Sequence, residues 1–242
     1  MGDNNLYDKL KDILKKTGGK YAILEDQVDV DLQLKFFEIS NSLRKDKRDI
    51  KDIIQDVALL YDSKIDIEQK KKILAELSDS DSVEAYRELE KYVKLTDSEL
   101  KQWALLAFQH CRIGLESKLL DEHKVFISTG LGGKDDKLRY FIAFKNKSGL
   151  GFSETQCKVI DNEFGFIFKK NNCEIEEIKY LDQYLAMIII MPVDCELGRI
   201  VASAINEVNL YGDFLQIDYL ITNVKMLEKN DIDFYFNKEN KK

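Results

Sequence analysis

Two Gly-Leu-Gly tripeptides, Gly130–Gly132 and Gly149–Gly151, are the residues whose type and spacing best suit binding of a phosphate. Glycine lets a backbone approach an anion closely, but a phosphate is held only where the loop leads into a helix N-terminus. The first tripeptide continues through Gly133 to Asp135 and Asp136 and then into a strand-like run. We therefore expect a hairpin connection there, because glycine and aspartate are the residues that such turns require.

The second tripeptide lies between a predicted strand and a predicted helix. A small anion there would meet Lys145, Lys147, Gly149, Gly151 and Ser153. Ser153 and Gln156 have the spacing of a capping box, which closes a helix N-terminus without any ligand. The third glycine of the dinucleotide-binding pattern is replaced by Glu154, whose carboxylate repels phosphate. Both interpretations stay open: an anion site, or a plain strand-to-helix connection.

Residues for catalysis are scarce. The chain has two histidines, His110 and His123, and His110 is next to Cys111. Neighbouring residues on a helix point about 100° apart, so that pair is not a nucleophile with its base. No G-x-S-x-G, H-E-x-x-H or calcium-loop motif occurs, and the four cysteines lack the spacing of a zinc site. We predict no cofactor, no metal and no enzymatic activity, while an enzyme of unknown type stays an alternative.

Charge and composition exclude several classes of partner. The 37 basic and 44 acidic residues give a net charge of −7, which disfavours a protein that coats duplex nucleic acid. Only Arg139-Tyr140 suggests stacking on a single strand. The sequence has neither a run of about 20 apolar residues nor a signal-peptide profile. We therefore expect a cytoplasmic protein with reduced thiols and no membrane contact.

Residues 1–121 read as an all-α domain. No glycine occurs between Lys20 and Ile113, and apolar residues recur at helical spacing. Helices are predicted around residues 6–14, 32–43, 50–61, 66–77, 82–94 and 97–119. Thr96 and Glu99 have the spacing of a capping box at the start of the last helix. The apolar Trp103–Phe108 segment predicts that this helix is either the central element or the seam against the second half.

The segment LSDSDSVEAYRELEKYV, Leu77 to Val93, resembles the turn and second helix of a HEAT repeat. It follows the L-x-D-x-D-x-V pattern of that family, but has Ser82 where proline is frequent and Glu84 where arginine is frequent. The resemblance implies stacked helix pairs with an extended surface for a protein partner. An irregular helical bundle fits the periodicity equally well.

One helix face within that segment is the candidate partner site. It combines aromatic and charged groups, as protein interfaces often do. Its members are Tyr86, Arg87, Glu90, Lys91 and Lys94. The same residues also suit an ordinary solvated face, because scattered exposed aromatic residues are common.

Residues 122–242 read as an α+β sandwich domain. Strand-like runs at 125–129 and 138–144 precede a helix at 153–170, and runs at 174–181 and 184–191 precede a second helical stripe at 197–208. This order suggests a duplicated ββα unit. A final strand is expected at 215–222, and 231–236 is a possible edge strand. The boundary between the two domains is predicted between Ser117 and His123.

These patterns together predict a non-enzymatic scaffold or protein-interaction protein with a HEAT-like helical surface. The alternative is an α+β domain that senses a small anion or nucleotide and has the helical half as its output. The sequence leaves the partner and the oligomeric state undetermined.

Overall fold

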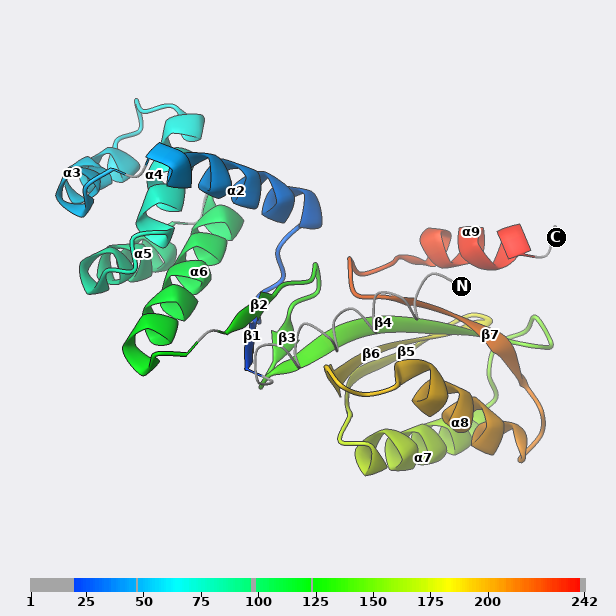
Figure 1. Ribbon diagram of the computed structural model, residues 1–242. Helices are drawn as coiled ribbons and strands as arrows, with labels where there is room; N and C mark the ends of the chain where they lie inside the picture. The colour runs from blue at the N-terminus through cyan, green and yellow to red at the C-terminus, as the bar shows by residue number, and fades with distance from the viewer. Residues whose placement is uncertain (1–19, 47, 97–98, 123, 240–242) are drawn as a thin grey trace. The chain divides into compact units, whose positions relative to one another are not determined.

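The computed structural model describes residues 20–46, 48–96, 99–122 and 124–239 (Figure 1). The chain divides into two compact units, Met1–Gly130 and Leu131–Lys242, and each is described by itself. The first is helical and the second contains the main sheet, so the predicted α+β class is confirmed. The helix expected around residues 6–14 lies outside the described residues.

The first unit is built from five α-helices and two 3₁₀ helices among its described residues. Aspartate or serine side chains cap four of the α-helices, at Asp29, Asp49, Asp66 and Ser82. The helices are α2 (Val30–Leu43), η1 (Arg44–Asp46), α3 (Ile50–Gln55), η2 (Asp56–Tyr61), α4 (Ile67–Ser78), α5 (Val83–Leu95) and α6 (Lys101–Leu120).

Helix α6 is the central element of this unit, which is one of the two roles that its apolar segment predicts. Trp103 is buried, its ring lies 5.4 Å from that of Phe36 in α2, and its Nε1 donates to the Lys71 carbonyl of α4 at 3.1 Å. The start of α6 differs from the prediction. It begins at Lys101, and Thr96 instead forms the C-cap of α5. Residues 97 and 98 of the predicted capping box lie outside the described residues.

A two-stranded parallel sheet ties the ends of the first unit together. Strand β1 (Tyr21–Ile23) pairs with β2 (Val125–Ile127), with Ala22 opposite Phe126. The run at 125–129 was expected to pair in the large sheet, but it belongs to the helical unit. This pairing moves the division of the chain to Gly130–Leu131, several residues beyond the predicted boundary at 121–122.

The second unit has a five-stranded antiparallel sheet with three helices. Its elements are β3 (Gly133–Lys134), β4 (Lys137–Asn146), α7 (Glu154–Lys170), β5 (Glu174–Leu181), β6 (Tyr184–Pro192), α8 (Leu197–Asn209), β7 (Leu215–Thr222) and α9 (Lys229–Glu239). Strands β3 and β7 both pair with β4, and β6 lies between β4 and β5. The order β4-α7-β5-β6-α8-β7 is that of the ferredoxin-like split βαβ arrangement.

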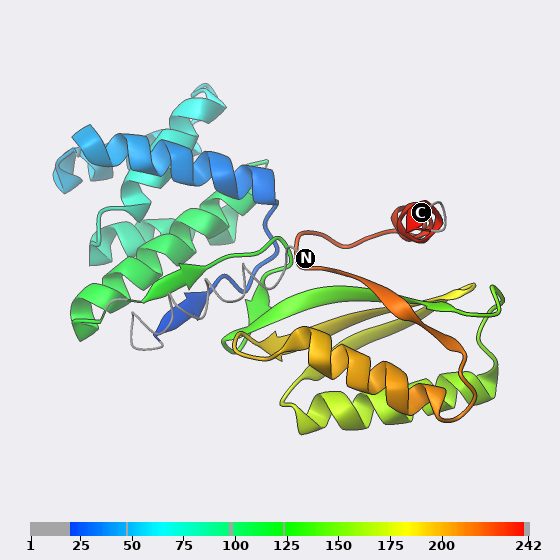
Figure 2. The same cartoon turned by 45° about the vertical axis from the view of Figure 1, so that its right-hand side comes forward.

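Each face of this sheet is covered differently (Figures 1 and 2). Helices α7 and α8 pack side by side on one face, where Ile142, Phe144 and Met187 meet Phe164 and Val201 in the main core. The opposite face carries a smaller apolar cluster under α9. Its buried members are Leu131, Phe141, Ala143, Tyr184, Ala186, Ile232 and Phe236.

The segment predicted as an edge strand, 231–236, is part of helix α9. Apolar residues at 232, 234 and 236 have a spacing that also suits a strand. The two that are buried, Ile232 and Phe236, are four residues apart and therefore lie on one face of a helix. Phe234, which lies between them in the sequence, is exposed.

The first glycine loop is a hairpin, as predicted. Asp135 and Asp136 form the two-residue connection between β3 and β4, and both have positive φ, at 48° and 59°. Gly132, just before β3, has φ of 67°. Such turns require left-handed conformations that aspartate and glycine tolerate. Within the described part of the chain, every helix is too short or too polar to cross a membrane.

Candidate functional site

The second glycine loop closes on itself. Ser153 Oγ accepts from the Gln156 N–H at 3.3 Å, and Gln156 Oε1 accepts from the Ser153 N–H at 2.9 Å, so the predicted capping box is present. Gly149 has φ of 72°, a backbone requirement that needs no ligand. The N-terminus of α7 is thus occupied by its own side chains.

The five residues of the predicted anion site are not brought to one point. The Lys147 ammonium pairs with Asp213 at 2.5 Å. Lys145 lies on β4, and its Nζ is 6.0 Å from the ring of Phe236 in α9. The geometry therefore favours the strand-to-helix connection and removes Lys145 to a different surface.

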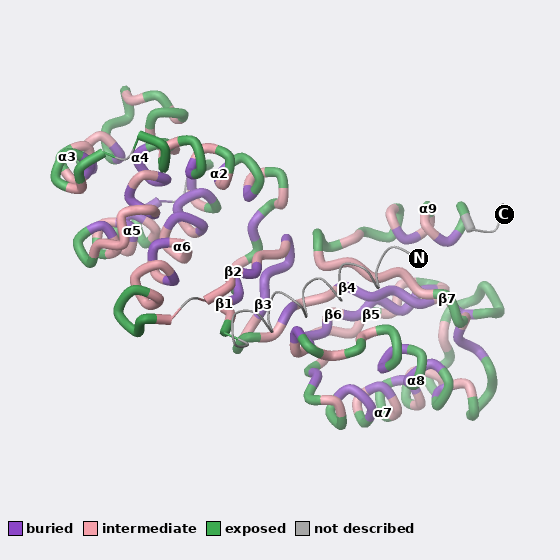
Figure 3. The backbone as a smooth tube through the Cα atoms, viewed as in Figure 1, coloured by how far each residue is buried: buried purple, intermediate pink, exposed green. Residues whose placement is uncertain are grey.

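The predicted partner face on α5 is an ion-paired helix surface. Helix α5 combines buried, half-buried and exposed residues (Figure 3). Glu90 accepts from Arg87 at 3.3 Å and from Lys94 at 3.2 Å, and Lys91 pairs with Glu88 at 2.5 Å. Lys94 and Arg87 lower the pKa of the Glu90 carboxyl. Such exposed pairs along one helix typically contribute little to stability.

Tyr86, the aromatic member of that face, is directed toward the core. Its ring lies 5.1 Å from that of Phe108 in α6, and it packs against the main apolar cluster of the unit. The face therefore has no aromatic anchor for a partner at this residue.

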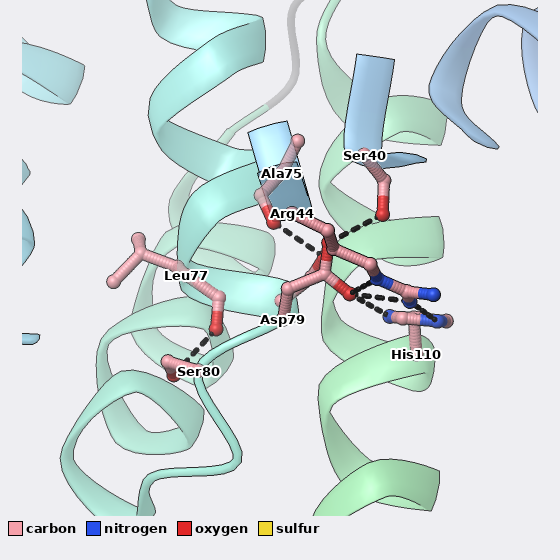
Figure 4. A network of polar contacts seen from close by, with 8 residues as sticks. Ser40, Arg44, Ala75, Leu77, Asp79, Ser80 and His110 are labelled. Carbon is pink, nitrogen blue, oxygen red and sulfur yellow. Dashed lines mark hydrogen bonds and ion pairs between the residues drawn. The ribbon is translucent and has the colours of Figure 1, made fainter. Parts of the chain in front are cut away.

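A polar network around Asp79 joins four elements of the first unit (Figure 4). The Ser40 hydroxyl of α2 donates to Asp79, and the Arg44 guanidinium donates to Asp79 Oδ1 from Nη2 at 2.6 Å and from Nε at 2.9 Å. His110 of α6 lies beside them, with its Nδ1 3.7 Å from Asp79 Oδ1. Asp79 itself is the C-cap residue of α4. One carboxylate thus holds α2, η1, α4 and α6 together.

Serine, histidine and aspartate occur together here, but not in the order that hydrolysis needs. A nucleophilic serine must donate to histidine, whereas Ser40 donates to the carboxylate. Burial lowers the pKa of the His110 imidazole, and the nearby Asp79 opposes that effect. His110 Nε2 is 3.3 Å from Arg44 Nη2, which suits a neutral ring accepting from the guanidinium. The network stabilises the fold and supplies no activated nucleophile.

One feature of the sequence points to this network, although no motif marks it. Asp79 and Asp81 both lie in the turn between α4 and α5, and Asp81 has φ of 48°. A Cβ on Gly114 of α6 would be 2.5 Å from Asp81 Oδ1. The one glycine inside the otherwise glycine-free helical region marks the place where this turn approaches α6.

Aromatic and charged side chains also lie together on the face of the sheet that α9 covers. The rings of Tyr184 in β6 and Phe236 in α9 are stacked, with centroids 5.5 Å apart and planes inclined by 19°. The Tyr184 hydroxyl donates to Asp233 at 2.7 Å. Burial and this hydrogen bond raise the pKa of Tyr184 to about 12.

The sheet register places lysine and aromatic side chains on this same face. Lys145 is directly opposite Tyr184, and Phe141 is opposite Ile188. Of the dipeptide Arg139-Tyr140, only Arg139 is on this face, because successive strand residues point to opposite sides. Arg139 is held by Glu176 through two hydrogen bonds, of 2.6 and 3.1 Å, and it lowers the pKa of that carboxyl. Sequence reasoning missed Tyr184 and Phe236 because they are 52 residues apart along the chain.

Comparisons with known proteins add little. No protein-family model matches the chain, and no curated protein matches it. A solved structure described as that of a "putative transposase" from Deinococcus radiodurans R1 is similar, with a TM-score of 0.36 and 14% sequence identity. The match covers 45% of this chain and 93% of that one. A score this low carries no function from that protein to this chain.

The prediction of a HEAT-like scaffold, with anion or nucleotide sensing as its alternative, is corrected. The predicted partner face on α5 is occupied by ion pairs within the helix, and the Gly149 loop is closed by the capping box of α7. The resemblance of Leu77–Val93 to a HEAT repeat stays a prediction. Among the described residues, no three histidine, cysteine, aspartate or glutamate side chains are placed to hold a metal ion.

Proposed function

We propose that the C-terminal unit binds single-stranded nucleic acid on the sheet face that α9 covers. The observation that carries the proposal is the stacking of Phe236 on Tyr184 beside the Lys145 ammonium. A flat ring on an aromatic side chain, with a cation close to it, is an arrangement that binds a nucleobase. In the closed form, in which α9 packs on the sheet, Phe236 occupies the position proposed for the base.

The positions of these residues in the sheet support the proposal. Tyr184 and Lys145 are on β6 and β4, the two strands at the centre of the βαββαβ unit. Four-stranded sheets of RNA-binding modules use aromatic residues on such strands to stack bases. Phe141 on β4 extends the apolar platform beside them.

Helix α9 buries few side chains on the sheet, so a nucleic-acid strand can displace it. Of the α9 residues whose burial is described, only Ile232 and Phe236 are buried, and Tyr235 packs against the same cluster while partly exposed. Polar contacts add to these. Lys229 pairs with Asp182 at 2.5 Å, and Asp233 accepts from Tyr184. Binding must overcome this closed state, so the apparent affinity falls by the fraction of molecules that are open.

The acidic net charge limits the kind of nucleic acid. With a charge of −7, affinity cannot come mainly from neutralised phosphates, and duplex nucleic acid is not the proposed partner. Stacking is tolerant of sequence, so the proposed ligand is any unpaired strand. The dependence of affinity on salt should accordingly be shallow.

The proposal describes a binding protein rather than an enzyme. It is supported by the Asp79 network, in which Ser40 donates to the carboxylate instead of to His110. A cytoplasmic location is part of the same proposal. The four cysteines have free thiols, and disulfides are rare in reducing compartments.

Fluorescence anisotropy with labelled 20-nucleotide oligothymidylate and oligouridylate tests the proposal. The full chain should bind weakly, and Phe236→Ala should bind at least tenfold more tightly because the cover is released. Tyr184→Ala in the Phe236→Ala background should abolish binding, whereas Tyr184→Phe should retain it, because the ring that stacks is kept.

Phe234→Ala is the matched control, because that α9 side chain is exposed. It should bind as the unchanged chain does. Absence of binding by both the full chain and Phe236→Ala, with both folded by circular dichroism, would overturn the proposal. Binding that survives Tyr184→Ala would also overturn it, since the strand would then lie elsewhere.

A further inference from the structure

The outer surface of α7 and α8 contains a groove that the proposed nucleic-acid site does not use. It has a volume of about 330 Å³ and runs between the two helices. We call it the α7–α8 groove, and its charged and apolar lining residues include Glu163, Phe166, Lys170, Arg199, Ile200 and Glu207. The groove is on the side of the two helices that faces away from the sheet. The residues of these helices that face the sheet include Ile160, Phe164 and Val201.

The two helices are antiparallel, which sorts the charges of the groove into two ends. Asn171, just after α7, accepts through its carbonyl from the Cys195 thiol just before α8. Glu163 in α7 contacts Tyr211 just after α8 and raises the pKa of its phenol. Lys170 and Arg199 therefore share one end of the groove, and Glu163 and Glu207 share the other.

The basic and acidic ends of the groove are too far apart to pair with each other within one molecule. Seven residues separate Glu163 from Lys170, and eight separate Arg199 from Glu207. At 1.5 Å per residue the basic and acidic ends are about 10 Å apart along the helices. Arg199 is also in the first turn of α8, where the helix dipole disfavours a positive charge. Glu196, whose Oε2 is 3.8 Å from Arg199 Nη1, offsets part of that cost, and an acidic group of a partner offsets more of it.

Exposed apolar side chains accompany the charges. Phe166 lies in the groove and is 65% exposed, and Leu210 and Tyr211 at the end of α8 are 78% and 63% exposed. Large aromatic residues exposed beside segregated charges are typical of interfaces, where an aromatic side chain fills a pocket of the partner. The volume of the groove is ample for one aromatic ring.

We infer that the α7–α8 groove is the interface of a symmetric homodimer, with a second copy of this chain as its occupant. A two-fold axis that lies in the interface, perpendicular to the helices at the middle of the groove, brings the basic end of one copy onto the acidic end of the other. Lys170 and Arg199 of each copy then face Glu163 and Glu207 of the other copy, so the same set of ion pairs forms twice. Such self-complementarity is what a two-fold interface requires. Phe166 of each copy lies near the axis and enters the groove of the other.

Sedimentation equilibrium of the full chain, over a wide range of concentration and at low salt, tests the inference. The unchanged chain should dimerise. Both K170E/R199E and E163K/E207K place like charges against each other, and each should weaken the dimer at least tenfold. An equimolar mixture of the two variants should form a heterodimer, and the chain with all four changes should dimerise again.

Lys158→Glu is the matched control, because Lys158 is exposed on α7 but does not line the groove. It should leave the dimer unchanged, while Phe166→Ala should weaken it. Circular dichroism establishes that each variant is folded. The variant with all four changes tests the interface even if one of the two double variants is less stable. An unchanged chain that stays monomeric at every concentration would overturn the inference. A dimer indifferent to both charge reversals would overturn it as well.

Discussion

The phenyl ring of Phe236 lies on the phenol ring of Tyr184, with 5.5 Å between the centroids. One ring belongs to α9 and the other to the central strand β6, so the pair joins the last helix of the chain to the middle of the sheet. A change that displaces Phe236 from Tyr184 is expected to expose the apolar cluster under α9, which includes Tyr184 and Phe141.

We expect Phe236→Ala to lower the free energy of unfolding by about 3 kcal/mol, because removing a buried aromatic side chain leaves a cavity. Urea denaturation measures the loss, and hydrogen exchange should locate it in α9. Phe234→Ala, on the exposed side of the same helix, should change the stability by less than about 0.5 kcal/mol. Equal effects of the two substitutions would contradict the placement of α9.

Stability should depend on the ionisation of Tyr184 at alkaline pH. Burial raises its pKa from the ordinary 10.0 to about 12, so the folded state favours the neutral phenol. The stabilisation is fully present below pH 10 and is lost as the pH rises from 10 through 12. Denaturant midpoints measured between pH 9 and 12 should fall less steeply for Tyr184→Phe. Parallel curves for the two proteins would show that this phenol is not perturbed.

Asp79→Ala should be among the most damaging single changes in the helical unit. It removes the acceptor of the buried Ser40 hydroxyl and the carboxylate partner of the Arg44 guanidinium, and we expect a loss of about 2–4 kcal/mol. Glu174→Ala removes an exposed pair with Lys134 and should cost under about 1 kcal/mol. Thermal and urea unfolding of both variants provide the comparison. A loss of less than about 1 kcal/mol for Asp79→Ala would mean that water replaces the hydrogen bonds of Asp79.

Two glycines with different surroundings should respond in opposite directions to alanine. Gly149 has φ of 72°, so Gly149→Ala should destabilise by about 1 kcal/mol. Gly165 lies inside α7, and a Cβ there meets nothing within 4 Å. Gly165→Ala should stabilise by up to about 1 kcal/mol, because alanine favours helix. A destabilising Gly165→Ala would instead show that another surface packs closely against α7 at this position.

The division of the chain can be tested with two N-terminal fragments. Residues 1–130 keep β2 and its pairing with β1, whereas residues 1–121 lose it. Residues 1–121 also lose Phe126, whose ring lies 6.1 Å from that of Phe37, and the Thr129 carbonyl that accepts from Gln33. We expect the melting temperature of the shorter fragment to be lower by several degrees. Equal melting temperatures would restore the boundary at 121–122.

Periodicity and capping predicted the regular elements well. The helix expected at 153–170 is α7, Glu154–Lys170, because Ser153 and Gln156 mark its start in the sequence. The hairpin at Asp135-Asp136 was equally predictable, since few residues tolerate two positive φ angles in succession. Both depend on interactions between residues close together in the chain.

The contacts that sequence reasoning missed join residues far apart. Strand β1 has only three residues, and nothing local marks Tyr21–Ile23 as the partner of Val125–Ile127. Asp79 has an ordinary helix-end position, and only the fold brings Ser40, Arg44 and His110 to it. The α9-covered face was missed for a related reason. A short segment with apolar residues at 232, 234 and 236 suits a strand and a helix alike.

The pairing of β1 with β2 also has a consequence for synthesis of the protein. Tyr21 is made early, but its partner Val125 is added 104 residues later. At about 5–20 residues per second, the first strand waits at least about five seconds on the ribosome before its partner is made. During that interval the edge of β1 is open to pairing with other chains. A pause in translation before residue 125 should therefore increase aggregation of the nascent protein more than a pause after residue 130.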